Sequence, residues 1–95
     1  MATDAGVRNI GDLRNFGQQL QKMGEQMYTL MQQAQQRLNT VSEGWHDTNN
    51  DKFKVRFADS VRTIKKMSDD FTQYNNYIKK TCEILEQYKG NNINF

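Results

Sequence analysis

The 95-residue sequence contains no proline, and only one cysteine and one histidine. Without proline, no residue removes a backbone donor from the interior of a long helix. The lone cysteine, Cys82, excludes an internal disulfide framework, and the single histidine, His46, cannot complete a zinc site with the usual number of ligands. We therefore expect a fold without covalent or metal crosslinks, and no cofactor.

Long apolar runs are also missing. The first 25 residues contain no apolar run behind a basic start, and no stretch of about 18 apolar residues occurs anywhere. We therefore expect neither a cleavable signal peptide nor insertion into a membrane. The net charge of +2, with 25% charged residues, is nearly balanced and does not predict strong attraction to nucleic acid or to a membrane surface.

Two long segments show the hydrophobic spacing of a helix. In the first, Leu13 begins a set of apolar residues at seven-residue intervals, and Phe16 begins a companion set three positions further on. This a/d-like spacing over four heptads predicts a helix over about residues 10–41. In the second segment, Phe57 belongs to a similar pattern, which predicts a helix over about residues 49–89.

The interval between these segments, residues 42–48, is rich in turn and cap residues. Gly44 suits the left-handed position that follows the end of many helices. Either Asp47 or Thr48 can accept a backbone N–H at the start of the second helix. Gly90 is expected to end that helix and to begin a flexible tail that runs to residue 95.

A short turn between two helices makes them antiparallel neighbours. The predicted fold class is therefore all-α, with a single helical-hairpin domain over residues 1–95. The predicted hairpin seam consists of Leu13, Phe16, Leu20, Met23, Met27, Leu30, Phe57, Ile64, Met67, Phe71, Tyr74, Ile78 and Leu85.

Two helices packed on one seam have almost no interior, and so small a core rarely stabilises a fold by more than about 3 to 5 kcal/mol. We therefore expect two hairpins to dimerise into a four-helix bundle. A second stripe on the helices is the predicted contact with the dimer partner, and consists of Gly17, Gly24, Tyr28, Met31, Val61, Tyr77 and Ile84. Its two glycines are either tolerated substitutions or points at which another helix approaches closely.

A tryptophan, Trp45, lies at the predicted turn, with Asp47 two positions further on and Phe53 eight positions further on. In this arrangement the chain resembles the WXG-type family of small helical-hairpin proteins, which type VII (Esx-type) secretion systems export. The resemblance covers nearly the whole chain in length, hydrophobic phasing and turn position, although this sequence has Asp47 where the family usually has glycine. It implies that the turn, with Trp45, Asp47 and Phe53, docks a partner; alternatively, the Trp45 ring plugs the end of the hairpin.

The resemblance also implies a location. Such a protein is cytoplasmic before export and is then secreted without a cleavable signal peptide, by itself or as the export partner or chaperone of a larger effector. Its partners would be a second copy or a paralogous hairpin, a larger effector and a secretion ATPase. Family members or their dimer partners often carry Tyr-x-x-x-Asp/Glu after the second helix, and no tyrosine here satisfies that pattern. The alternative function is that of a cytoplasmic adaptor or a subunit of another complex.

We expect no enzymatic activity, because two helices alone offer no cleft in which catalytic groups converge. His46 is expected to be solvated, and Cys82 to be a small, partly buried hydrophobe. The second predicted helix has an excess of basic residues, but acidic residues three or four positions away indicate a solvated, ion-paired face. Nucleic acid is therefore a less favoured partner than protein, and its signature would be a steep salt dependence of binding.

Overall fold

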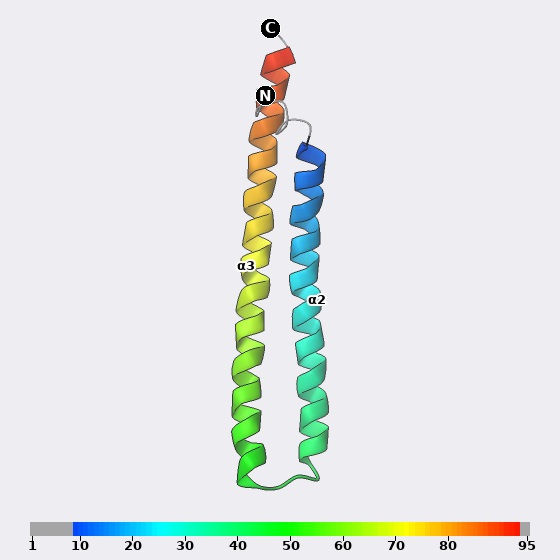
Figure 1. Cartoon of the computed structure of the whole chain (residues 1–95), viewed down its shortest axis with the longest axis vertical. Helices are drawn as coiled ribbons and strands as arrows, with labels where there is room; N and C mark the ends of the chain where they lie inside the picture. The colour runs from blue at the N-terminus through cyan, green and yellow to red at the C-terminus, as the bar shows by residue number, and fades with distance from the viewer. Residues whose placement is uncertain (1–8, 94–95) are drawn as a thin grey trace. The chain divides into compact units, whose positions relative to one another are not determined.

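The computed structural model describes the backbone of residues 9–93 and the side chains of residues 9–88. Within that range the chain forms two long helices that pack against each other as in a hairpin, with no strand (Figure 1). Helix α2 spans Ile10–Ser42 with 33 residues, and α3 spans Thr48–Ile93 with 46 residues. The predicted all-helical hairpin is thereby confirmed.

The first helix ends without a left-handed glycine. The chain leaves α2 through a narrower turn in which each hydrogen bond joins residues three apart. The backbone N–H groups of Glu43, Gly44 and Trp45 donate to carbonyl oxygens in the last residues of α2, at 3.1–3.2 Å. No glycine among the described residues has a positive φ angle. The left-handed conformation predicted for Gly44 is therefore wrong, because the narrower turn already satisfies the free carbonyl groups.

The second helix runs past its predicted end. Gly90 lies inside α3, and the helix continues to Ile93, so the prediction of a flexible tail is wrong for residues 90–93. A glycine ends a helix when it adopts the left-handed conformation; as a helical residue it costs only about 1 kcal/mol. No proline follows to prevent continuation. Residues 94–95 of the predicted tail lie outside the described range.

The chain divides into two compact units, each containing part of both helices. The terminal unit joins the start of α2, up to Lys22, to α3 from Phe71 onward. The turn unit comprises residues 23–70 and includes the connection between the helices.

In the terminal unit, the helices meet through small and polar side chains. Cys82 is completely buried, and its Sγ lies 3.8 Å from the carbonyl oxygen of Ile10. Gly17 is buried so closely against α3 that a Cβ atom there would lie 2.6 Å from Oδ1 of Asn75 and 3.0 Å from a methyl group of Ile78. The Asn75 amide donates to Oε1 of Gln21 at 2.7 Å. Close approach of the backbones, rather than interlocking large side chains, forms this contact.

In the turn unit, too, the helices meet mainly through small and polar side chains. Val61 is its one buried large hydrophobic residue among those described, and Gly24, Ser42, Asn50 and Ser68 are buried with it. The hydroxyl of Ser42 donates to Oδ1 of Asn50 at 3.1 Å and so connects the end of α2 to the start of α3.

The predicted hairpin seam requires correction. Five of its residues are exposed rather than enclosed between the helices, with exposed fractions from 37% to 63%: Phe16, Met23, Leu30, Met67 and Tyr74. The others are half-buried: Leu13, Leu20, Met27, Phe57, Ile64, Phe71, Ile78 and Leu85. Conversely, three residues of the predicted partner stripe are buried: Gly17, Gly24 and Val61. The small residues let the helices meet along a line beside the most apolar stripe, not through it.

Gly17 provides a direct test of this close contact. We expect Gly17→Leu to lower the free energy of unfolding by about 2 kcal/mol, because its side chain would overlap Asn75 and Ile78. Gly11→Ala is the matched control in the same helix, where a Cβ atom meets nothing within 4 Å. It should stabilise the chain by up to about 1 kcal/mol through helix propensity. Urea unfolding followed by circular dichroism measures both; equal effects of the two substitutions would contradict the close approach.

Candidate functional site: an open apolar face and a hydrogen-bonded turn

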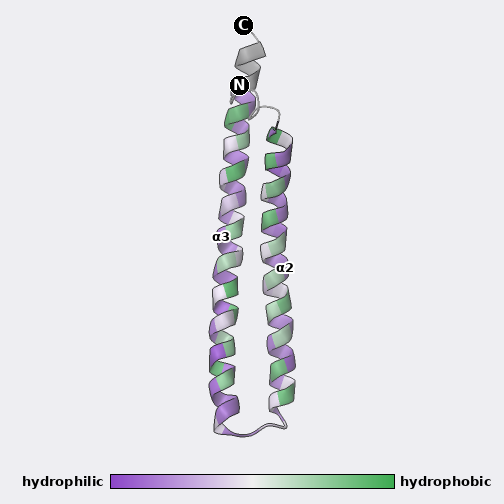
Figure 2. Cartoon of the chain, viewed as in Figure 1, coloured by the Kyte–Doolittle hydropathy of each residue, from purple (hydrophilic) through white to green (hydrophobic). Residues whose placement is uncertain are grey.

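The exposed apolar residues of α2 form one stripe. Phe16, Met23 and Leu30 recur every seven residues and are 53%, 49% and 63% exposed. At about 100° per residue, they lie beside the half-buried Leu20 and Met27 on one side of the line where α2 meets α3. Hydrophobic residues recur in this way along both helices (Figure 2).

The corresponding stripe of α3 contains the exposed Met67 and Tyr74 and the half-buried Ile64, Phe71 and Ile78. The rings of Phe71 and Tyr74 are neighbours along it, tilted with respect to each other, with centroids 6.1 Å apart. On α3, too, the stripe lies on one side of the line of contact with α2.

Polar contacts between the helices show that the two stripes share a side. In the terminal unit, Arg14 forms an ion pair with Glu86, on the flank of each helix away from its apolar stripe. In the turn unit, Nζ of Lys65 lies 5.4 Å from the centre of the Tyr28 ring, again on that flank. Since the polar flanks of α2 and α3 meet within each unit, the apolar flanks of the two helices also lie on a common side of that unit. The exposed residues there are Phe16 and Tyr74 in the terminal unit, and Met23, Leu30 and Met67 in the turn unit. We call these residues the open apolar face.

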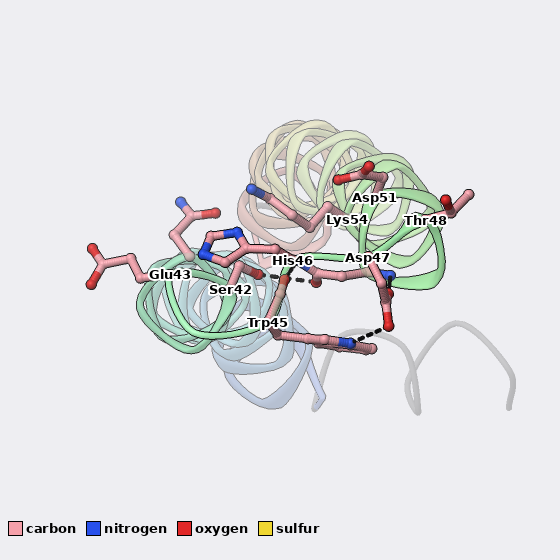
Figure 3. Close-up of a pocket in the computed structure, with 10 residues that line it drawn as sticks. Ser42, Glu43, Trp45, His46, Asp47, Thr48, Asp51 and Lys54 are labelled. Carbon is pink, nitrogen blue, oxygen red and sulfur yellow. Dashed lines mark hydrogen bonds between the residues drawn. The ribbon is translucent and has the colours of Figure 1, made fainter.

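The turn between the helices is a compact hydrogen-bonded unit (Figure 3). Oδ1 of Asp47 accepts the backbone N–H of Asn50 at 2.8 Å, which is the geometry of an N-cap. Oδ2 of the same carboxylate accepts the indole N–H of Trp45 at 2.9 Å. The Asn50 amide in turn donates to the Trp45 carbonyl at 2.7 Å. Of the two predicted caps, the structure therefore selects Asp47.

These hydrogen bonds act on the charge of Asp47. The backbone N–H of Asn50, then the indole N–H of Trp45, lower the pKa of the Asp47 carboxyl below its ordinary value of 3.8. The carboxylate is thus ionised over the whole physiological pH range. Its second role, as the acceptor for the indole N–H of Trp45, is not predicted by the sequence.

The Trp45 ring remains accessible despite this hydrogen bond. It is 37% exposed, and His46 points to a different side of the turn (Figure 3). Phe53 is exposed as well, and it makes an edge-to-face ring contact with Phe57 at 6.0 Å. The polar group of the indole is engaged internally, so a partner at the turn would meet the apolar surface of the ring.

A recess of about 570 Å³ surrounds the turn and is lined mainly by polar residues, including Glu43, His46, Asp51 and Lys54. In the described part of the chain, no group of three or more His, Cys, Asp or Glu residues could hold a metal ion. The thiol of Cys82 is fully buried rather than partly buried as predicted.

The residues of the predicted partner stripe differ widely in their exposure to solvent. Its members Tyr77 and Ile84 are 73% and 62% exposed, whereas Tyr28 and Met31 are half-buried. Together with the three buried members, these positions do not form one continuous surface.

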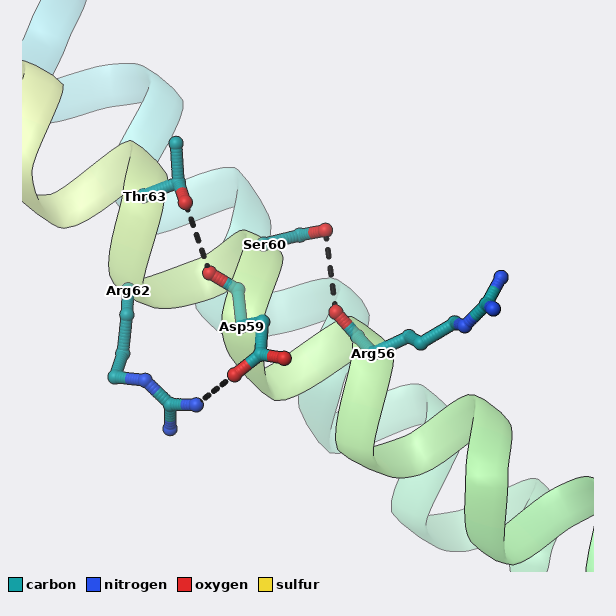
Figure 4. A network of polar contacts seen from close by, with 5 residues as sticks. All are labelled: Arg56, Asp59, Ser60, Arg62 and Thr63. Atoms are coloured by element: carbon teal, nitrogen blue, oxygen red, sulfur yellow. Dashed lines mark hydrogen bonds and ion pairs between the residues drawn. The ribbon is translucent and has the colours of Figure 1, made fainter.

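Basic residues on α3 are partly paired. Arg62 forms an ion pair with Asp59, while Arg56 extends away from that pair (Figure 4). Lys65 donates to Asp69 at 2.9 Å, and this hydrogen bond raises the pKa of the Lys65 ammonium group. Such exposed pairs mainly solvate a helix face and contribute little stability.

Neither described helix has an apolar stretch long enough to cross a membrane. Comparison of the chain with models of protein families, with curated proteins and with solved structures gave no match.

Asp47 yields a prediction with a defined pH dependence. Because the folded state lowers the pKa of this carboxyl, its stabilisation is complete above pH 3.8 and is lost as the pH falls through the lower, folded value. Asp47→Asn keeps an acceptor for the cap but removes the charge, so it should lower the melting temperature at neutral pH, by less than Asp47→Ala. The difference between Asp47→Asn and the wild type should shrink as the pH falls below 3.8.

Thermal unfolding by circular dichroism across this pH range measures the effect, and Trp45 fluorescence reports on the turn. Asp51→Asn is the matched control, since Asp51 lies in the first turn of α3 but is not its cap. A difference between Asp47→Asn and wild type that stays constant with pH would rule out the charged cap.

Proposed function

We propose that this chain is a non-enzymatic, WXG-like helical hairpin that is secreted, or that accompanies a larger effector, in a type VII-like secretion system. In this proposal two hairpins form a four-helix bundle, and each chain is cytoplasmic before export. Its partners are a second copy or a paralogous hairpin, and, during export, an effector and a secretion ATPase.

The observation that carries the proposal is the open apolar face. The contact between α2 and α3 encloses Gly17, Asn75 and Cys82, while Phe16 and Leu30 remain more than half exposed. A soluble protein rarely leaves such a row of large apolar side chains in water unless another surface covers it. A hairpin with this distribution is half of a bundle rather than a complete fold.

The turn supports the same proposal. Trp45 stands at the bend between two long helices, where the resemblance to WXG-type proteins places their tryptophan. Asp47 fixes the ring by accepting its N–H, and an accessible aromatic side chain held in one orientation suits a binding hot spot.

One observation favours a second candidate function. No tyrosine is followed by an acidic residue four positions later, so the chain lacks the signal that WXG-type proteins or their dimer partners often carry. A hairpin with the same face but without its own signal could act as a cytoplasmic adaptor or as a subunit of another complex, associating through the same apolar residues.

Export from the native cell separates the two functions. A tagged chain should reach the medium only when the membrane ATPase of the secretion system is active, and co-purification before export should recover a hairpin or effector partner. Retention in cells that are actively secreting their known substrates would favour the adaptor. Trp45→Ala should abolish recovery of the effector while preserving helicity, if the turn docks it.

The open apolar face itself is tested by removing two of its residues. We expect Phe16→Gln combined with Leu30→Gln to raise the dissociation constant of the assembly by at least about 100-fold, because each substitution removes a large apolar side chain from the interface. Sedimentation equilibrium measures this constant, and circular dichroism verifies that the helices persist. The control is Gln18→Ala together with Gln32→Ala, which changes exposed polar positions of α2 away from this face. A wild-type chain that sediments as a stable folded monomer at micromolar concentration would contradict the bundle.

A further inference from the structure

The contact between the helices of the terminal unit contains strained polar groups and few strong interactions. We infer that this unit opens by itself: residues 10–22 of α2 separate from α3 while the turn unit stays folded, and the opening exposes the buried thiol of Cys82. The opening goes beyond the proposed export function and does not depend on it.

Two buried polar atoms of the terminal unit have no hydrogen bond, Oδ1 of Asn75 and Nε of Arg14. Water can bond to both atoms once the helices separate, so opening recovers the free energy that their burial costs. The turn unit, which the structure describes over the whole of residues 23–70, has no such atom. The closed form is therefore less favourable in the terminal unit than in the turn unit.

The polar contacts that close the terminal unit are weak. The ion pair of Arg14 with Glu86 is exposed to solvent, and such pairs contribute little stability. The hydrogen bond from the Asn75 amide to Gln21 is replaced by bonds to water when the unit opens. Partly buried apolar residues occur in both units, so they do not offset this difference.

The turn unit is held by contacts between residues that are close in sequence. Ser42 and Asn50, which share a buried hydrogen bond, are eight positions apart, whereas Ile10 and Cys82 are 72 positions apart. Closing the longer interval costs more chain entropy, unless nearer contacts already hold the helices together. The distant contacts consequently depend on the near ones, and they can be lost without them.

Cys82 makes this opening measurable. Its side chain is completely buried, and its Sγ lies 3.8 Å from the carbonyl oxygen of Ile10, the first residue of α2. A thiol reagent reaches Cys82 only after the start of α2 leaves α3. Cys82 is the only cysteine in the sequence, so the reaction reports on this position alone.

The rate at which DTNB forms a mixed disulfide with Cys82 tests the inference. Under native conditions, this thiol should react at least about tenfold faster than the thiol of a matched chain that carries Cys82→Ala and Val61→Cys. Val61 is buried in the turn unit. Each rate is divided by the rate of the same chain unfolded in urea, which corrects for thiol reactivity. Labelling of Cys82 should also depend less steeply on urea than global unfolding does, because opening exposes less surface.

Substitutions in the two units should act differently on the labelling rate. Asp47→Ala weakens a cap that the closed and the opened forms share, so it should change labelling of Cys82 by less than about twofold. The same substitution should speed labelling of Val61→Cys about fivefold. Gly17→Leu destabilises only the closed form of the terminal unit and should speed labelling of Cys82 about 30-fold, whereas the control Gly11→Ala should not speed it.

Two results would overturn the inference. Equal normalised rates and equal urea dependence for the two thiols would show that the helices separate only when the whole chain unfolds. An acceleration of Cys82 labelling by Asp47→Ala as large as that of Val61→Cys labelling would show the same. Failure of export in the native cell leaves both labelling results unchanged, so it bears on the proposed function alone.

Hydrogen exchange of the wild-type chain provides a measurement that needs no substitution. Amides of residues 14–22 and 75–88 should exchange at least about tenfold faster than those of residues 27–38 and 54–66, because a helical segment that loses its neighbour unfolds locally. Mass spectrometry of peptides from the exchanged chain resolves these segments. Equal protection of the two units would contradict a separate opening.

Discussion

The close contact between the two helices determines most other properties of this chain. Gly17 lies so near α3 that an added Cβ atom would be 2.6 Å from the side chain of Asn75. Helices that approach this closely leave no room for large side chains between them. Phe16, Met23 and Leu30 consequently lie to one side of the contact, where they are exposed.

The polar groups in this contact define its register while contributing little to its strength. Ser42 bonds to Asn50 in the turn unit, and Asn75 bonds to Gln21 in the terminal unit. A hydrogen bond of this kind adds about 1 kcal/mol, whereas sliding one helix would leave buried polar atoms unpaired at a cost of about 1–3 kcal/mol each. Oδ1 of Asn75, beside Gly17, is already buried without a hydrogen bond, which offsets part of the gain. The hairpin is thus specific in alignment but small in apolar burial.

The sequence predicted the elements of the fold better than their contacts. Heptad spacing predicted two helices, and Asp47 was one of two predicted caps; the structure has helices over Ile10–Ser42 and Thr48–Ile93 with Asp47 as the cap. The face of each helix that meets the other was predicted only in part: Ile78 of the predicted seam lies against Gly17, whereas Phe16 of that seam is exposed. Seven-residue spacing is shared by two neighbouring stripes of α2, that of Phe16 and that of Gly17. The usual rule, that the more hydrophobic stripe faces the neighbouring helix, selects the stripe of Phe16. That rule fails when small residues make the contact inside one chain.

The candidate site was predicted in part, for a related reason. The sequence points to Trp45 and Asp47 as turn residues, but the hydrogen bond between the indole N–H and Oδ2 depends on the path of the backbone through the turn, which no spacing rule encodes. The termini of the helices likewise depend on the conformations of single residues such as Gly44 and Gly90, where helical and left-handed states differ by about 1 kcal/mol. A prediction from composition cannot resolve so small a difference.

In the proposed bundle, the separation of polar and apolar contacts onto opposite flanks would let one chain be specific both in folding and in association. On one flank, Arg14 pairs with Glu86 and Lys65 lies over Tyr28, so the alignment of α2 with α3 uses charges and hydrogen bonds. On the other flank, the exposed apolar residues do not contribute to the alignment of α2 with α3. Phe16 and Leu30 are more than half exposed, so a partner that covered them would remove much apolar surface from water. In the proposed bundle, association would therefore add hydrophobic stabilisation without requiring the two helices that present the face to rearrange.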